Sequence, residues 1–116
     1  MRVLVCGGRN YNDWRRVYDE MDAINSATPI EAVITGAASG VDGIALDWAK
    51  SRLIKCLPFP ADWKKHGRAA GPIRNQQMLD EGLPALVVAF PGGRGTADMI
   101  GRAIGANIPV RKIALR

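Results

Sequence analysis

The sequence contains no apolar run long enough to cross a membrane. Its longest, residues 83–91, is far shorter than the roughly 18 residues that a spanning helix needs. The N-terminal stretch 1–5 leads directly into Gly7 and Gly8, without the cleavage pattern of a signal peptide. These absences predict a cytoplasmic protein that makes no membrane contact.

Cysteine and histidine are scarce. Cys6 and Cys56 stand far apart, each inside an apolar run, so we expect buried free thiols rather than a disulfide or metal ligands. His66 is the only histidine, which excludes a histidine-rich metal site. We therefore predict neither a metal nor a cofactor.

Low-complexity tracts and tandem repeats are also missing, which excludes disordered proteins and repeat arrays. The composition that remains is globular, with 47% hydrophobic and 23% charged residues. Because a chain of 116 residues buries about two-thirds of its unfolded surface, it needs no disulfide or metal for stability. We predict one domain over residues 1–116.

The formal net charge of +5 is unevenly distributed. Residues 1–58 carry seven basic and seven acidic side chains, whereas residues 59–116 carry nine basic and four acidic ones. The whole surplus therefore lies in the second half. A localised basic site suits a small anion as well as a nucleic acid.

Strand and helix patterns alternate along the chain, separated by glycine or proline. Strands are predicted at 2–6, 32–35, 53–59, 83–90 and 110–115, and helices at 13–25, 39–49, 72–81 and 96–104. Asp13 is a plausible N-cap of the first helix, and 60–70 is predicted to be irregular. This alternation predicts an α/β fold, a Rossmann-like three-layer sandwich with a five-stranded parallel sheet and helices on both faces.

The fold predicts where a ligand binds. In open parallel sheets the ligand crevice lies beyond the carboxyl ends of the strands, where the strand order reverses. In this chain those ends lead into loops 7–12, 35–40, 59–71 and 91–96, and three of the four are rich in glycine.

The loop 91–96, PGGRGT, is the sharpest local signal. It follows a buried strand and opens a helix, so its amides can converge on a phosphate at the positive end of the helix dipole. Thr96 would serve as helix cap or as hydroxyl donor. A tight turn is the alternative, but three glycines and an arginine exceed what one turn needs, so we favour anion binding. The residues predicted to bind are Gly92, Gly93, Arg94, Gly95 and Thr96.

The loop 35–42, TGAASGVD, repeats this arrangement after the second strand. It lacks the lysine of a Walker motif, and Ala37 stands where a nucleophile elbow needs glycine. Gly36, Ser39 and Gly40 are predicted to line the ligand site. Asp42 either accepts a hydrogen bond from a ribose hydroxyl or caps its helix, and the sequence favours neither.

The loop after the first strand, residues 7–13, lacks the Gly-x-Gly-x-x-Gly spacing of a dinucleotide site. Its glycines, Gly7 and Gly8, lie at the predicted crevice. Beside them, Arg9 is predicted to meet a phosphate, with a solvated surface charge as the alternative. Tyr11 is a candidate to stack on a base.

The stretch 60–75 is long, polar and basic, and long loops in compact domains are often functional. Trp63 either anchors this stretch or stacks on a base. Arg74 is the preferred clamp for a phosphate or carboxylate, with Asn75 beside it as a further ligand-binding candidate.

Several motifs in one order resemble the YspA-like branch of the SLOG superfamily. They lie at 1–13, 36–49, 60–63, 66–75 and 90–99 and so cover nearly the whole chain. The superfamily also holds the LONELY GUY phosphoribohydrolases and the DNA-processing protein DprA. The resemblance implies a Rossmann-like fold with a site for a nucleotide or nucleotide-derived ligand, and for the YspA-like branch it implies no established reaction.

The phosphoribohydrolases carry Pro-Gly-Gly-x-Gly-Thr-x-x-Glu, whose glutamate helps to break an N-glycosidic bond. Residues 91–96 match this motif, but Met99 stands at the glutamate position, and a thioether cannot replace a carboxylate there. Their upstream arginine resembles Arg74. The resemblance thus implies that the phosphate-binding half of the site is kept. The candidate catalytic residues are Asp42 and, about 100° around the helix from Met99, Asp98.

Three functions follow from these patterns. The first is a binding module that senses or sequesters a small nucleotide-derived ligand, such as a nucleoside phosphate or an ADP-ribose-like molecule. The second is a phosphoribohydrolase-like N-glycosidase that acts on nucleoside monophosphates through Asp42 or Asp98. The third, ranked last because the charges cluster at the loop edge, is a single-stranded nucleic-acid-binding module. We also expect a homo-oligomer, with Trp14 and Trp48 as candidates for its contact faces, although both fit the core pattern.

Overall fold

Five parallel strands form the sheet of the computed structural model, which describes residues 1–115. They are β1 (Arg2–Cys6), β2 (Ala32–Thr35), β3 (Lys55–Pro58), β4 (Leu86–Ala89) and β5 (Val110–Lys112). Their order in the sheet is β3-β2-β1-β4-β5, and every neighbouring pair is parallel. The chain moves outward from β1 to β3 and returns to β4 on the other side of β1. The strand order therefore reverses between β1 and β4.

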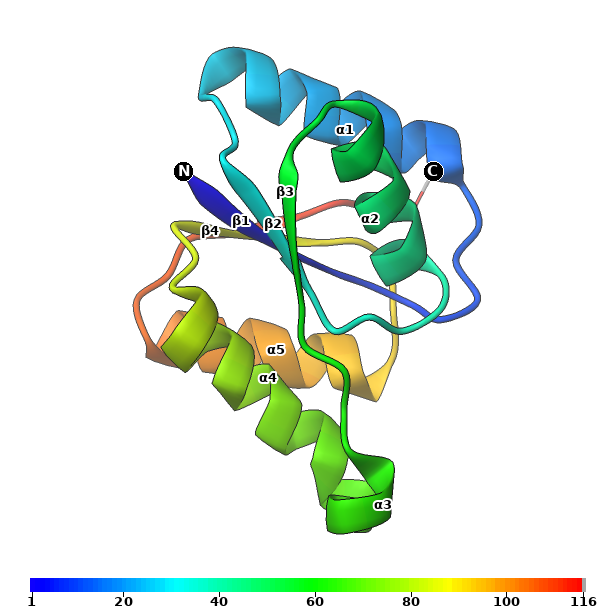
Figure 1. Ribbon diagram of the computed structural model, residues 1–116, viewed down its shortest axis with the longest axis vertical. Coiled ribbons are helices and arrows are strands. Elements are labelled where there is room, and N and C mark those ends of the chain that lie inside the picture. Colours follow the sequence, from blue (N-terminus) through cyan, green and yellow to red (C-terminus); the bar gives the residue numbers. More distant parts are fainter. Residues whose placement is uncertain (116) are drawn as a thin grey trace.

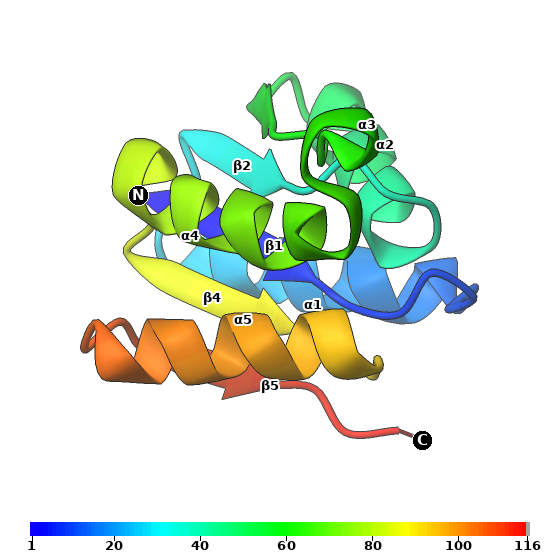
Figure 2. The ribbon, with the colours of Figure 1, turned by 90° about the horizontal axis from the view of Figure 1, so that it is seen from below.

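Two pairs of helices cover the two faces of the sheet (Figures 1 and 2). They are α1 (Trp14–Ala27) with α2 (Val41–Ser51), and α4 (Ala70–Gly82) with α5 (Arg94–Gly105). Successive strand residues point to opposite faces, so Val3 and Val5 pack with α1 and α2, whereas Leu4 packs with α4 and α5. The predicted three-layer Rossmann-like sandwich is confirmed.

The basic stretch after β3 is more regular than predicted. It contains a short helix, α3 (Trp63–His66), and a 3-10 turn, η1 (Gly67–Ala69), which leads directly into α4. The Asp62 carboxylate caps α3 by accepting a hydrogen bond from the Lys65 amide at 3.1 Å. The prediction of an irregular segment over 60–70 was therefore wrong, because a local capping residue was overlooked.

The tryptophans and cysteines differ in part from expectation. Trp48 is fully buried, but Trp14, at the first position of α1, is 53% exposed. Both thiols are free, as predicted, although Cys56 is only half-buried. Within residues 1–115, no helix has the length and apolar character needed to cross a membrane.

Candidate functional site

A cavity of about 650 Å³ opens at the carboxyl ends of β1 and β4, where the strand order reverses. The loops after these strands are joined there, because the Gly8 amide donates to the Pro91 carbonyl at 2.9 Å. This volume lies in the range typical of small-molecule sites. The predicted residues that line the cavity are Gly7, Gly8, Arg9, Gly36, Asp42, Trp63, Arg74, Asn75, Gly93, Arg94, Gly95, Thr96 and Asp98.

Four predicted site residues do not line this cavity: Tyr11, Ser39, Gly40 and Gly92. The Tyr11 ring is partly buried against Phe90, with ring centroids 5.9 Å apart, so it packs on the core. The Ser39 hydroxyl donates to the Arg9 carbonyl at 3.3 Å.

The two glycines outside the cavity hold its walls together. Gly40 has φ of +73°, and a side chain there would collide with the Gly8 carbonyl, which accepts the Val41 amide at 3.2 Å. Gly92 lies against the Thr96 hydroxyl, which leaves no room for a Cβ. Both glycines are therefore needed for the close approach of the loops.

Positive charge surrounds the cavity. Arg9, Arg68, Arg74 and Arg94 line it, and none of them forms an ion pair within residues 1–115. Arg68 had not been singled out for the site, because its position depends on η1. Guanidinium groups without carboxylate partners favour an anionic ligand.

Arg74, in the first turns of α4, reaches the loop after β2. Its Nη1 donates to the Gly36 carbonyl at 2.6 Å and its Nε donates to the Asn75 side-chain oxygen at 3.1 Å. These two bonds fix the plane of the guanidinium, and within residues 1–115 its Nη2 has no partner. Arg74 is thus held in place by two hydrogen bonds, while its Nη2 can still donate to a ligand.

The loop after β4 begins α5. Gly93 is the N-cap residue, so the interpretation of Thr96 as the cap was wrong, and Thr96 lies in the first turn. The residue is only 8% exposed and lines the cavity, and its hydroxyl has no hydrogen-bond partner among residues 1–115. The hydroxyl is thus a polar group at the cavity wall that is available to a ligand at a helix N-terminus.

Asp42 is a buried carboxyl group within this positive site, with 7% of the residue exposed. Burial raises the pKa of Asp42 above its usual value, although the hydrogen bond from the Ala38 amide and the charge of Arg74 oppose the change. Oδ2 of Asp42 accepts the amide of Ala38, which lies in the loop before α2. The carboxylate therefore also acts as a capping residue does, by binding a loop amide near the start of its helix. A perturbed carboxyl in a cavity indicates a functional group.

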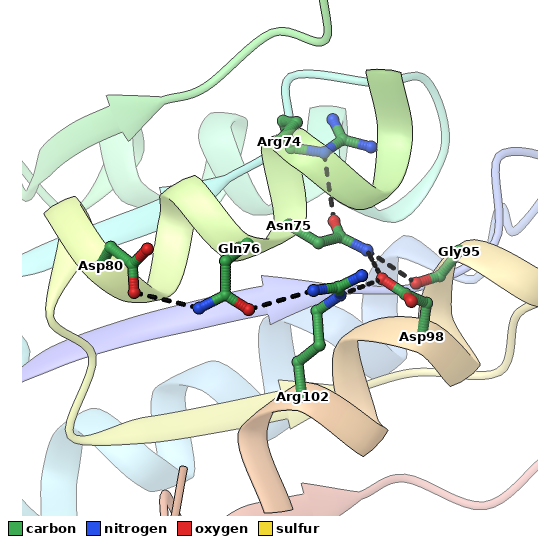
Figure 3. Close-up of polar contacts among 7 residues, drawn as sticks. All are labelled: Arg74, Asn75, Gln76, Asp80, Gly95, Asp98 and Arg102. Atoms are coloured by element: carbon green, nitrogen blue, oxygen red, sulfur yellow. Dashed lines mark hydrogen bonds and ion pairs between the residues drawn. The ribbon is translucent and has the colours of Figure 1, made fainter. Parts of the chain in front are cut away.

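Asp98 lies at the cavity edge but is held by protein groups (Figure 3). Its Oδ2 accepts from Arg102 Nε at 2.8 Å and from Asn75 Nδ2 at 2.9 Å. Although burial acts against it, these two hydrogen bonds lower the pKa of Asp98. Asp98 is therefore ionised and paired, which disfavours it as a general acid.

Asn75 connects the two helices that flank the cavity. Its amide donates to the Gly95 carbonyl at 3.1 Å as well as to Asp98, and its oxygen accepts from Arg74 (Figure 3). Sequence reasoning placed Asn75 among the ligand contacts. In the structure its amide positions Arg74 and the start of α5.

Met99, which stands where the phosphoribohydrolase motif has its glutamate, lies in the core. Met99 is fully buried between α5 and the sheet, so no polar group replaces the carboxylate there. The cavity also includes residues that were not predicted for it: Cys6, Ala38, Gly71, Pro72 and Met78. Within residues 1–115, no group of three or more His, Cys, Asp or Glu side chains is placed to hold a metal ion.

The strand order and the glycine loops at its reversal define a Rossmann-like α/β protein. The model of the YspA, cpYpsA-related SLOG family (YAcAr) matches residues 1–66. The Gene 61 protein of Mycobacterium phage D29 is 36% identical over 117 residues, which cover 94% of this chain and 93% of that protein. The chain therefore belongs to the YspA, cpYpsA-related SLOG family.

A solved structure shares the architecture. The X-ray structure of TM1055, a Northeast Structural Genomics Consortium target, matches with a TM-score of 0.71 at 19% identity. The match covers 94% of this chain and 71% of that chain. At this identity the likeness concerns the fold alone.

Proposed function

We propose that this protein binds a small nucleotide-derived anion in the cavity, such as a nucleoside phosphate or an ADP-ribose-like molecule. By binding it in the cytoplasm, the protein senses or sequesters that ligand. Membership of the SLOG family and the Rossmann-like architecture support a nucleotide-related role.

The observation that carries the proposal is the start of α5. The Thr96 hydroxyl, at the cavity wall, has no hydrogen-bond partner among residues 1–115, and it lies where the helix dipole favours a negative group. Arg94 and Arg74 line the same cavity and supply positive charge. A phosphate satisfies the hydroxyl and the charges together.

Asp42 is suited to the sugar of such a ligand. One of its oxygens accepts the Ala38 amide, and the residue lines the cavity beside Gly36. A carboxylate accepts hydrogen bonds from the hydroxyl groups of a ribose. A fully ionised inorganic phosphate has no hydroxyl group to donate. Asp42 therefore favours a sugar phosphate over an inorganic anion.

The direct test is calorimetric titration with a panel of nucleoside phosphates and ADP-ribose derivatives. At least one is expected to bind saturably, and Arg94→Gln is expected to weaken that binding by roughly 10- to 100-fold, the effect of losing a charge-assisted hydrogen bond. Arg111→Gln, on the exposed side of β5, is the matched control and leaves affinity unchanged. No saturable binding by any member of the panel would sink the proposal.

A second candidate is hydrolysis of an N-glycosidic bond, favoured by the raised pKa of Asp42 in the cavity. A carboxyl whose pKa is raised by burial is suited to protonate a leaving group. Incubation with nucleoside monophosphates, followed by chromatography for free base, tests this reaction. Asp42→Asn is expected to abolish release, and the absence of free base at high protein concentration would exclude it.

A small ligand is proposed in preference to single-stranded nucleic acid because the unpaired arginines gather around one cavity. Nucleic-acid binding predicts an affinity that falls steeply with salt. In a gel-shift assay with a single-stranded oligonucleotide we expect no complex at physiological ionic strength. A salt-sensitive shift would favour the nucleic-acid alternative.

A further inference from the structure

A second hollow, of about 240 Å³, adjoins the main cavity; we call it the side hollow. The residues that line both spaces are Arg9, Gly36, Ala38, Trp63 and Arg74. Because the two spaces share this border, a ligand bound in the main cavity has room to extend a second group into the side hollow.

Three amides of the loop beside the side hollow are not available to a second phosphate, because Ala37 donates to Thr35 Oγ1, Ala38 to Asp42 and Val41 to the Gly8 carbonyl. This contrasts with the start of α5, where the Thr96 hydroxyl at the cavity wall has no hydrogen-bond partner among residues 1–115. The positive charge of Arg9 and Arg74 lies at the border with the main cavity, within reach of a phosphate bound there.

The remaining walls are small and mostly apolar. They are Ala37, Pro60, Ala61 and Ser39, whose hydroxyl already donates to the Arg9 carbonyl, and no acidic side chain lines the side hollow. With these walls, the side hollow suits a flat and largely uncharged group of the ligand.

Trp63 supplies an aromatic face at the border of the two spaces. Its side chain is exposed although it begins α3, and its ring lies near the start of α4, at Gly71. The Arg9 guanidinium lies 5.4 Å from the centre of the Trp63 ring. Arg9 has no ion pair within residues 1–115, so only this weak cation–π contact holds it at the Trp63 ring, and an aromatic ring can compete for the same face.

We propose that the side hollow is the base subsite of a nucleotide whose phosphate binds at Thr96. The aromatic ring of the base lies against Trp63 among Ala37, Pro60 and Ala61. Arg9, at the border, then turns toward the phosphate. This inference rests on the proposed function, and it adds that recognition requires an aromatic base and not merely a sugar phosphate.

The test compares AMP with ribose 5-phosphate by calorimetry on the intact protein. AMP is expected to bind about tenfold more tightly or better, the gain typical of stacking one base on an aromatic side chain. Ala61→Leu fills the side hollow and is expected to remove that gain while leaving the affinity for ribose 5-phosphate unchanged. Ala27→Leu, an exposed alanine at the end of α1, is the matched control and alters neither affinity.

The outcomes separate this inference from the proposed function. Equal affinities of the unmodified protein for AMP and ribose 5-phosphate overturn the base subsite and leave the phosphate site standing. A failure of both to bind removes the phosphate site and this subsite with it. Trp63→Leu is the second variant, and an undiminished preference for AMP in either variant also overturns the inference.

Discussion

Asp42 is a residue whose burial should destabilise the fold but serves the proposed binding role. It is an acidic side chain, buried and close to Arg9 and Arg74, yet without an ion pair within residues 1–115. Burial of a carboxylate without a full partner destabilises the fold. A buried carboxyl at a cavity wall is explained if a ligand hydroxyl completes its hydrogen bonds.

Asp42→Asn should raise the melting temperature at neutral pH. The folded pKa of Asp42 lies above its ordinary value of 3.8, so stability falls as pH rises through the folded pKa. Asparagine keeps an acceptor for the Ala38 amide and removes the charge, so the gain should be present at pH 7 and vanish below the ordinary pKa. Melting curves of both proteins across pH 3 to 8 measure this. A variant that melts lower than the unmodified protein at pH 7 would contradict the assignment.

Cys6 should be unreactive although it lines the cavity. Burial, with a smaller contribution from the charge of Asp42, raises the pKa of the Cys6 thiol to about 12. The thiolate is the reactive form, so little of Cys6 reacts with a thiol reagent at pH 8. In a timed reaction with such a reagent, the Cys56→Ser variant should react only after denaturant is added, whereas the Cys6→Ser variant, which keeps the half-buried Cys56, should react faster in the folded state. Fast labelling of the folded Cys56→Ser protein would refute this.

At the scale of elements, α4 and α5 are joined by polar contacts that run from the cavity outward. Asn75 bonds Asp98, and Arg102 bonds both Asp98 and Gln76, whose amide donates to Asp80 (Figure 3). The two anion-binding candidates, Arg74 on α4 and the start of α5, are therefore held at a fixed separation.

Asn75→Ala should loosen this connection. The substitution removes the hydrogen bond from Asn75 to the Gly95 carbonyl and one of the hydrogen bonds that Asp98 accepts. We therefore expect the free energy of unfolding to fall by about 1–3 kcal/mol. Urea denaturation measures the change. Gln77→Ala, exposed on the same helix, is the control and should change stability by less than about 0.5 kcal/mol. Equal stabilities of the two variants would show that Asn75 does not connect the helices.

The elements themselves could be predicted because their signals are local. Strand and helix alternation follows from apolar periodicity, and Asp13 caps α1 as predicted, accepting the Arg16 amide at 3.2 Å. Strands β3, β4 and β5 were predicted too long, because apolar residues continue into the flanking loops. Leu53, Leu83 and Leu115, at the ends of the predicted strands, are exposed. An apolar run therefore does not report where strand pairing stops.

The side-chain partners of the site could not be predicted in the same way. Glycine loops at strand ends predicted the edge where the cavity lies, and Arg74 could be chosen from its charge and helix position. That Asp98 also accepts a hydrogen bond from Asn75, or that Tyr11 turns toward Phe90, depends on packing between distant segments. Contacts of this kind follow from the tertiary arrangement and leave no local pattern.

At the scale of the whole molecule, we propose that the protein self-associates through the face that carries Trp14. This side chain is 53% exposed and makes an edge contact with Tyr18, whereas Trp48 is buried and unavailable. Light scattering after size exclusion should show a mass above that of one chain, 12.5 kDa. Trp14→Ser is expected to shift it to the monomer, whereas Leu53→Ser, an exposed apolar residue after α2, should not. A monomer at every concentration would contradict the proposal.

The whole molecule converges on one cavity, because the loops after β1, β2, β3 and β4 all meet there. The most direct test of the account is a crystal structure of the protein soaked with AMP. It predicts a phosphate group within hydrogen-bond distance of the Thr96 hydroxyl, with Arg74 or Arg94 beside it. A nucleotide bound elsewhere on the molecule, with the start of α5 untouched, would contradict it.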